Sequence, residues 1–354
     1  MRSTPLGPHI QTAGALTTEG RAWAREAGIV KQMDGISALA EAAPGAITIY
    51  RRYFAESELE RALADHQWTC EAIAAGLAGF RPAFVQLLCE RYQNVDERLA
   101  EHITLTRYAV RWFAGLGIRV AGFAFSTGSP RQEAWELLRR ENYGDLREHG
   151  GVILLDEYWG YCGPVASQWN ARRHELIHQW TQGDHPDFII GETGRDAVYD
   201  DMPPEVQAAI KAGHADEFAG WKRQPVTPDQ YAEELLAYRD GLPAYVLGVT
   251  PFGIAPYPDW AHFTYDEIVP TLRARTGGWY VAALPSEPAR PVVTSRGEDR
   301  TVDAQSYFYL EWAQARKAHG EDHRDVVAFC AHLKAVGKDA SDPYKAGFPC
   351  SPKA

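Results

Sequence analysis

Eight short β-rich segments recur through residues 7–249, and longer helical segments separate them. These β-rich segments are residues 7–11, 28–31, 46–50, 83–88, 120–125, 152–155, 188–190 and 245–249. Most of them are continuously apolar instead of alternating between apolar and polar residues. Continuous apolar runs are typical of strands that are buried on both faces, so the pattern favours a parallel sheet over an antiparallel one.

Four of the intervening segments have amphipathic helical periodicity, namely residues 57–76, 95–115, 132–148 and 168–182. The first begins with Ser57 and Glu60, which are spaced as a capping box. Strand-then-helix repeated eight times in roughly 270 residues predicts an α/β fold, the (β/α)8 TIM barrel, over residues 1–275. A doubly wound open sheet is the competing fold, but it is expected to carry a glycine-rich phosphate turn, and the sequence has no GxGxxG.

The rhythm of strands and helices stops after about residue 275. Residues 276–301 are rich in Pro, Gly and charge, which indicates a loop or linker. Residues 303–336 then return to helical spacing. We therefore expect residues 276–354 to form a linker and a helical C-terminal extension packed on the barrel.

Composition and charge exclude several classes of protein. The 36 Lys and Arg against 47 Asp and Glu give a net charge of −11, which argues against nucleic acid as a partner. The longest apolar runs are too short to span a bilayer. Residues 1–5 lead into polar sequence without a signal-peptide core, so we expect a cytoplasmic, particle-associated or non-classically released protein. The five cysteines form no CxxC pair, which argues against a disulfide framework or a zinc knuckle.

Carboxylates follow several of the predicted strands, where a barrel of this kind builds its active site. Glu90 follows the fourth strand, Asp156 follows the sixth and Glu192 follows the seventh. Residues 188–194, FIIGETG, resemble the strand-seven motif ITETG of clan A glycoside hydrolases, and residues 155–159, LDEYW, resemble the strand-six motif HEYW of the same clan. Residues 123–130 are similar to the strand-five stretch of some of its members.

Membership of that clan implies hydrolysis of a β-linked oligo- or polysaccharide with retention of configuration. Glu192 would be the nucleophile and Glu90 the general acid/base, and no metal or organic cofactor would be required. A retaining mechanism needs one ionised and one protonated carboxyl about 5 Å apart. The resemblance thus predicts a carbohydrate substrate, with neither a nucleic acid nor a membrane as partner.

The remaining candidate site residues surround this pair. Tyr158 is expected to orient Glu192 through a hydrogen bond, and Arg51 or Arg52 to hold a carboxylate ionised. Aromatic faces for a sugar are expected from side chains near the strand ends, namely Tyr92, Trp159 and Trp260. His9 and Lys31 end early strands and are interpreted as structural or substrate-positioning residues.

Two positions depart from the clan pattern. The residue before the strand-four Glu is Cys89, where the clan has an Asn that contacts the sugar 2-hydroxyl. A thiol is a weaker hydrogen-bonding group than an amide. The strand-six His is replaced by Asp156, which adds an acid near the mouth and is a candidate substrate-binding residue.

Two other functions stay open at the level of sequence. The first is a non-catalytic barrel that binds carbohydrate or serves as a structural component, for example of a phage particle. The second is a zinc metallopeptidase, because His174-Glu175-Leu176-Ile177-His178 matches HExxH. On a helix this motif places two imidazoles on one face, with Glu175 as the base for a zinc-bound water.

Overall fold

The computed structural model describes residues 4–89, 98–165 and 169–276. All of them belong to one unit of the chain, and the predicted linker and extension fall outside them from residue 277 onward. Eight strands form one sheet in the order β1 to β8, and every neighbouring pair is parallel. The strands are β1 His9–Ile10, β2 Ile29–Met33, β3 Ile47–Arg51, β4 Phe84–Gln86, β5 Arg119–Phe125, β6 Val152–Trp159, β7 Phe188–Arg195 and β8 Val246–Pro251.

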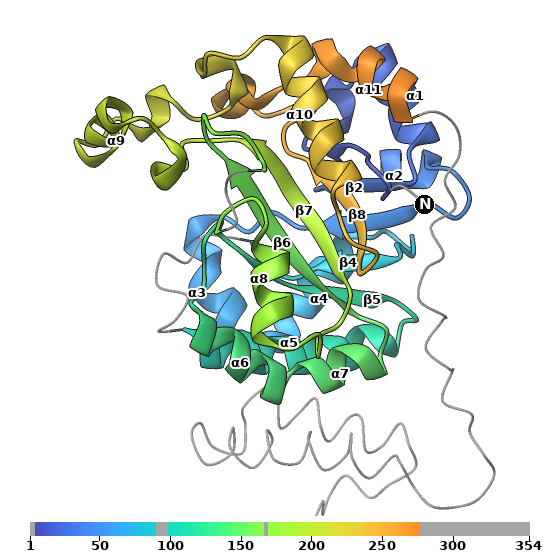
Figure 1. Ribbon diagram of the computed structural model, residues 1–354. Coiled ribbons are helices and arrows are strands. Elements are labelled where there is room, and N and C mark those ends of the chain that lie inside the picture. Colours follow the sequence, from blue (N-terminus) through green and yellow to red (C-terminus); the bar gives the residue numbers. More distant parts are fainter. Residues whose placement is uncertain (1–3, 90–97, 166–168, 277–354) are drawn as a thin grey trace, which may run out of the picture. The chain divides into compact units, whose positions relative to one another are not determined.

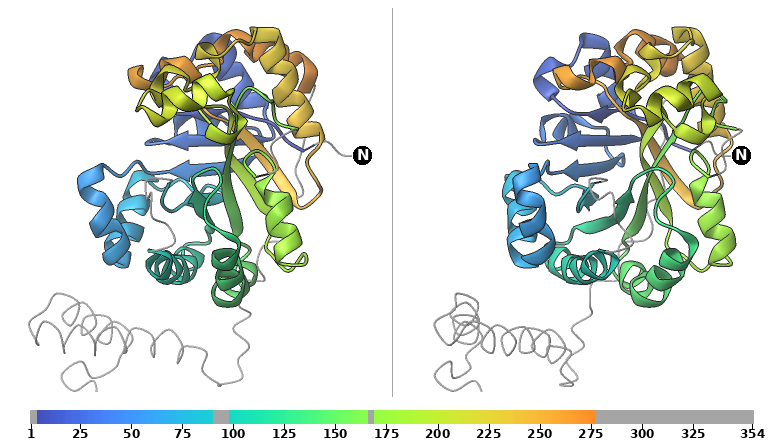
Figure 2. Two further views of the ribbon diagram at one scale, coloured as in Figure 1. Left: turned by 60° about the vertical axis from the view of Figure 1, so that its left-hand side comes forward. Right: turned by 90° about the vertical axis from the view of Figure 1, so that its left-hand side faces the viewer.

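Helices connect these strands and surround them on the outside, as Figures 1 and 2 show. The α-helices are α1 Thr18–Glu26, α2 Ser37–Glu41, α3 Glu56–Ala64, α4 His66–Gly76, α5 Leu99–Ala114, α6 Gln132–Glu141, α7 Tyr143–Glu148, α8 Arg173–Trp180, α9 Pro204–Lys211, α10 Pro228–Asp240 and α11 Val269–Thr276. Short 3₁₀ helices are η1 Ala13–Ala15, η2 Tyr199–Asp201, η3 Ala215–Glu217, η4 Trp221–Arg223, η5 Pro258–Phe263 and η6 Asp266–Ile268. None of the described helices has the length and apolarity needed to cross a membrane.

The sheet closes where the N-terminal segment meets β8. Parallel bridges pair Leu6 with Val249 and Ile10 with Ile254, so both ends of the sheet have hydrogen-bonding partners. Closure removes the exposed edges that an open sheet would leave. The fold is therefore the predicted (β/α)8 barrel. Its strands contribute a core cluster of buried residues: Ile29, Ile47, Ile49, Phe84, Ala121, Ala124, Val152, Leu154 and Ile189.

Several predicted element boundaries were wrong. The helix expected over residues 57–76 is two helices, because the side chain of Asp65 accepts a hydrogen bond from the Trp68 N–H and starts α4 there. The Ser57–Glu60 capping box is replaced by half of one, two residues earlier, in which the Glu58 carboxylate accepts from the Ala55 N–H; Ala55 has no side-chain oxygen for the reciprocal bond. Likewise, the helix expected over residues 132–148 is divided into α6 and α7. Strands β6 and β7 run four and five residues beyond their predicted ends, to Trp159 and Arg195, which places the candidate site residues on strands instead of loops.

Candidate functional site

A bulge in β7 places Glu192 at the centre of the candidate site. Leu155 pairs with Ile190, but the next residue, Asp156, pairs with Glu192, so Gly191 is an extra residue on β7. A Cβ at Gly191 would lie 2.3 Å from Leu154 Cδ2, which leaves little room for a larger residue there. Bulges of this kind redirect side chains. Here the bulge brings the two acids Asp156 and Glu192 opposite each other.

Two cations and a tyrosine hold the Glu192 carboxylate from three other strands. Arg51 Nη1, at the end of β3, donates to Oε1 at 2.5 Å, and Lys31 Nζ, on β2, donates to the same oxygen at 3.1 Å. The Tyr158 hydroxyl, on β6, donates to Oε2 at 3.0 Å. Lys31 also donates to the Gly191 carbonyl at 2.9 Å, so it fixes both the carboxylate and the bulge that directs it. The Tyr158 hydrogen bond and the arginine contact that the sequence suggested are thus present. Lys31, which was interpreted as a structural or substrate-positioning residue, contacts the Glu192 carboxylate directly.

These partners keep Glu192 ionised although it is only 3% exposed. Burial by itself raises the pKa of a carboxyl. The charges of Lys31 and Arg51, with the hydrogen bonds from Lys31 and Tyr158, outweigh this effect and lower the pKa of Glu192 below its ordinary value.

Arg51→Met is expected to raise the pKa of Glu192, because one of the two cations beside the carboxylate is lost. A ¹³C NMR titration of the Glu192 carboxyl measures this change directly. Arg52→Met is the matched control, because Arg52 donates instead to the Ala72 carbonyl and to Glu58. Equal effects of the two substitutions would contradict the assignment of Arg51 as the partner of Glu192.

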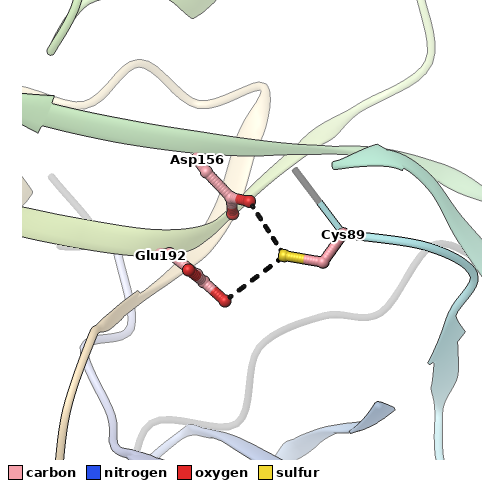
Figure 3. Close-up of side chains that lie close together, drawn as sticks. All are labelled: Cys89, Asp156 and Glu192. Carbon is pink, nitrogen blue, oxygen red and sulfur yellow. Dashed lines mark hydrogen bonds between the residues drawn. The ribbon is translucent and has the colours of Figure 1, made fainter. Parts of the chain in front are cut away.

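Asp156 is the second buried acid of the site, and it lies close to Glu192 and Cys89 (Figure 3). Burial raises the pKa of Asp156 well above its ordinary value, and the negative charge of Glu192 raises it further. The Cys89 Sγ, just beyond β4, lies 3.7 Å from Asp156 Oδ2 and 3.8 Å from Glu192 Oε1, and its single hydrogen can be donated to either oxygen. Asp156 Oδ1 has no hydrogen-bond partner among the described residues. The site therefore places a carboxyl of lowered pKa beside a carboxyl of raised pKa, which is the division that acid–base chemistry requires.

His9 completes the buried side of the site from β1. Its Nδ1 lies 3.7 Å from Glu192 Oε1, and neither ring nitrogen has a hydrogen-bond partner among the described residues. Burial, followed by the charges of Lys31 and Arg51, holds the pKa of His9 well below its usual range, so the imidazole is neutral. The ring packs edge-on against Phe252, the residue after β8, with 5.4 Å between ring centroids. Phe252 was not among the predicted site residues.

Cys89, Asp156 and Glu192 are the only His, Cys, Asp or Glu side chains in the described ranges that converge as ligands for a metal do. One ligand atom from each lies within 4.8 Å of the others. However, the Glu192 oxygen in this group already accepts from Arg51 and Lys31. Two cations so close oppose the binding of a third. The electrostatics of the cluster therefore favour an acid–base pair over a metal centre.

Alternation along β6 separates its four terminal residues onto two faces. Tyr158 contacts Glu192, and Asp156 contacts Cys89. Glu157 and Trp159 instead contact the outer helices α8 and α10. Trp159 is fully buried, its indole N–H donates to Glu234 at 3.0 Å, and its ring packs against Tyr238 of α10. The predicted role of Trp159 as a sugar-stacking face was therefore wrong. The strand continues through this residue and turns the indole outward.

The HExxH segment lies within α8 and contacts the outward-facing side of β6. His174 donates its backbone N–H to Glu157 at 2.7 Å, and its Nδ1 lies 3.0 Å from both oxygens of that carboxylate. His178 contacts His185, with 2.8 Å between Nδ1 and Nε2, and Glu175 pairs with Arg172. No third acidic, cysteine or histidine ligand converges on His174 and His178 in the described part of the chain. His174 of the motif therefore links α8 to β6 by hydrogen bonds. The described residues give no support to a zinc peptidase.

Of the remaining predicted site residues, one borders the site, one faces away from it and two lie outside the described residues. Trp260 is half-buried in η5 and packs against Phe252 with 5.6 Å between ring centroids, so it borders the same cluster as Tyr158. The guanidinium of Arg52 lies over the rings of Phe54 and Trp68 and donates to the Ala72 carbonyl and to Glu58. Glu90 and Tyr92 lie outside the described residues, and their roles stay predictions.

Comparisons with known proteins find likeness in solved structures only. No family model and no curated protein matches the chain. XacCel5A, solved in complex with cellopentaose, is 9% identical, and the match covers 78% of this chain and 99% of that one with a TM-score of 0.42. The endo-β-1,4-glucanase Xac0030 from Xanthomonas axonopodis pv. citri is 10% identical over 76% and 98% of the two chains, with a TM-score of 0.41.

A β-mannanase from Thermomonospora fusca, solved as a mannotriose complex, is 12% identical. That match covers 74% of this chain and 91% of the mannanase, with a TM-score of 0.35. Likeness at this level does not carry an activity over to this chain, so the site itself has to support any function.

Proposed function

We propose that this protein hydrolyses a β-glycosidic bond with retention of configuration and that Glu192 is the nucleophile. The observation that supports this most is the Glu192 carboxylate itself. It is held ionised by Lys31, Arg51 and Tyr158 at the carboxyl ends of the barrel strands, where barrel enzymes carry out their chemistry. The motif resemblance of residues 188–194 to clan A glycoside hydrolases points to the same residue.

In this mechanism a carboxylate oxygen of Glu192 attacks the anomeric carbon as the bond to the leaving-group oxygen breaks. Water then hydrolyses the covalent glycosyl-enzyme and restores the carboxylate. Tyr158, Lys31 and Arg51 contribute by fixing the orientation of the carboxylate and by keeping it charged between turnovers. The buried site requires no metal ion for these steps.

The leaving-group oxygen also needs a proton donor. The resemblance assigns this role to Glu90, and we retain that proposal. Among the described residues, Asp156 is the acid with suitable properties, because burial raises its pKa and it offers an oxygen within 4.8 Å of a Glu192 oxygen. These two oxygens are therefore no farther apart than the ~5 Å separation of carboxyls in retaining enzymes.

The first experiment is a panel of aryl β-glycosides and neutral polysaccharides, followed by trapping with an activated 2-fluoro-glycoside of each sugar that is cleaved. Peptide mass spectrometry is expected to find the fluorosugar attached to Glu192. Attachment to another residue would exclude Glu192 as the nucleophile. Binding of sugars without turnover of any panel member would instead favour the non-catalytic barrel.

The proton donor is identified by the dependence of the rate on the leaving group. Loss of the acid slows glycosides with poor leaving groups severely but hardly affects the glycosylation step of those with good ones. Glu90→Gln and Asp156→Asn are compared on both kinds of aryl glycoside. We expect Glu90→Gln to show this selective loss. The same pattern in Asp156→Asn alone would transfer the role to Asp156.

A further inference from the structure

A pocket of about 360 Å³ lies beside the candidate site, at the carboxyl ends of β5, β6 and β7. Its volume is within the range of about 300–1,000 Å³ that is typical of small-molecule sites. Tyr158 forms part of its wall and donates from its hydroxyl to Glu192, so the pocket adjoins the carboxylate. The residues that line it are Ser126, Thr127, Gly128, Ser129, Tyr158, Trp169, Asn170, Asp196, Ala197, Val198, Tyr199 and Asp200.

Trp169 is the aromatic side chain of this pocket that is most suited to binding a ligand. It is 44% exposed, one of the few large apolar side chains in the described ranges with so much surface open to solvent. The indole is nevertheless fixed. The guanidinium of Arg173 lies over the ring at 4.1 Å, and Trp180 contacts it edge-on at 6.0 Å.

The support beneath Trp169 is buried and rigid. Arg173 is 2% exposed, it also stacks on Trp180 at 5.0 Å, and its guanidinium donates to the Pro130 carbonyl. A cation between two indoles gains from cation–π attraction, more so when it is desolvated. Trp169 is thereby held in place before any ligand arrives, which reduces the entropy lost on binding.

The loop after β5 closes tightly around the other edge of the indole. Gly128 has a φ of +79°, and a Cβ on it would lie 3.1 Å from Trp169 Nε1 and 3.2 Å from Asn170 Oδ1. Thr127 connects this loop to β6, because its hydroxyl donates to the Asp156 carbonyl at 2.9 Å and accepts from the Tyr158 N–H at 3.2 Å. The pocket is thus joined by hydrogen bonds to the strand that carries Asp156 and Tyr158.

The polar groups of the pocket indicate the class of ligand. Its lining residues include the carboxylates of Asp196 and Asp200, the amide of Asn170 and several hydroxyls, but no Lys, Arg or His. Such a lining disfavours an anionic ligand, whereas sugar hydroxyls can donate to the carboxylates and accept from the amide. An exposed indole face beside these groups suits the C–H face of a pyranose ring.

We propose that this pocket is a subsite for a neutral pyranose unit of a β-linked chain, stacked on Trp169 next to the unit that Glu192 attacks. The proposal rests on the proposed function, because Glu192 defines where the neighbouring sugar unit is attacked. Binding of a sugar in the pocket can nevertheless be measured without turnover. A chain that extends over β5–β7 would occupy the pocket, and a single sugar with an aryl leaving group would make fewer contacts there.

The test measures calorimetric Kd values for cello-, manno- and xylo-tetraose on the Glu192→Gln protein, with and without Trp169→Ala. Stacking on an indole predicts a weakening of about 3- to 10-fold for the tetraose that binds. Ala197→Trp fills part of the pocket from the segment after β7, while the native Trp169 and Arg173 are kept, and is expected to weaken the same tetraose at least as much. Trp112→Ala, on the outer helix α5, is the control and should leave Kd unchanged.

The outcomes separate the subsite from the proposed activity. Weaker tetraose binding in both pocket variants supports the subsite even if the wild-type protein hydrolyses nothing. In that case the proposed function is wrong and the subsite is retained. Unchanged tetraose binding in both variants of a protein that cleaves β-glycosides overturns the subsite and leaves the function. Absence of tetraose binding to the parent protein, or an equal loss in the Trp112 control, also overturns the subsite.

Discussion

Replacing Glu192 by Gln is expected to lower kcat/KM for β-glycoside hydrolysis by about 10³-fold or more, as removal of a catalytic nucleophile does in other enzymes. Glutamine has nearly the same shape but lacks the negative charge that attacks the anomeric carbon. Its amide oxygen can still accept from Arg51 and Lys31, but the amide carries no negative charge to balance theirs. The site then contains two buried cations without their anion, which is unfavourable in itself.

The control for this prediction is Glu133→Gln, an exposed position on α6. Steady-state kinetics of both variants on the best substrate of the panel, with circular dichroism to check folding, provide the measurement. A Glu192→Gln enzyme that kept more than a tenth of wild-type kcat/KM, on protein free of contaminating activity, would rule out Glu192 as the nucleophile.

Glu157→Ala is expected to lower the free energy of unfolding by about 3–5 kcal/mol, the cost of breaking a buried charged network by removing one partner. Glu157 is fully buried and accepts from the backbone N–H of His174 and from the Tyr238 hydroxyl, and it contacts the His174 ring. Alanine leaves all of these groups buried without an acceptor. The contacts join α8 and α10 to β6, so the loss affects the packing of two helices.

Glu175→Ala is the informative comparison, because Glu175 is the residue that a zinc peptidase would use as its base. Its carboxylate is partly exposed and pairs with Arg172, the N-cap residue of α8, so its removal should cost no more than about 1 kcal/mol. Urea unfolding of the two variants tests this difference. Greater destabilisation by Glu175→Ala than by Glu157→Ala, together with stoichiometric zinc in the wild-type protein, would restore the peptidase interpretation.

Much of the architecture could be predicted from local sequence, because apolar runs and helical periodicity are visible within short segments. Each barrel strand lies within or overlaps an apolar run such as 152–155 or 188–190, since a strand covered by both the barrel interior and the helices has no exposed face for polar residues. The alternation of strand and helix then leaves few topologies other than the barrel. Element ends were less predictable. The break at Asp65 depends on one capping hydrogen bond that competes with continued helical periodicity.

The sequence by itself determined the barrel and which strand ends would carry acids, because strand-end positions in this fold converge wherever their side chains point inward. Only the tertiary structure decided how those residues are used. Arg51 and Arg52 are neighbours in the chain, yet the first contacts Glu192 and the second contacts α4, because successive residues at the end of a strand face opposite ways. The same alternation puts Asp156 inside and Trp159 outside, and the extra residue Gly191 sets Glu192 opposite Asp156. Convergence of Lys31, Arg51, Tyr158 and Glu192 needs four strands in register, and no local pattern in the chain encodes that register.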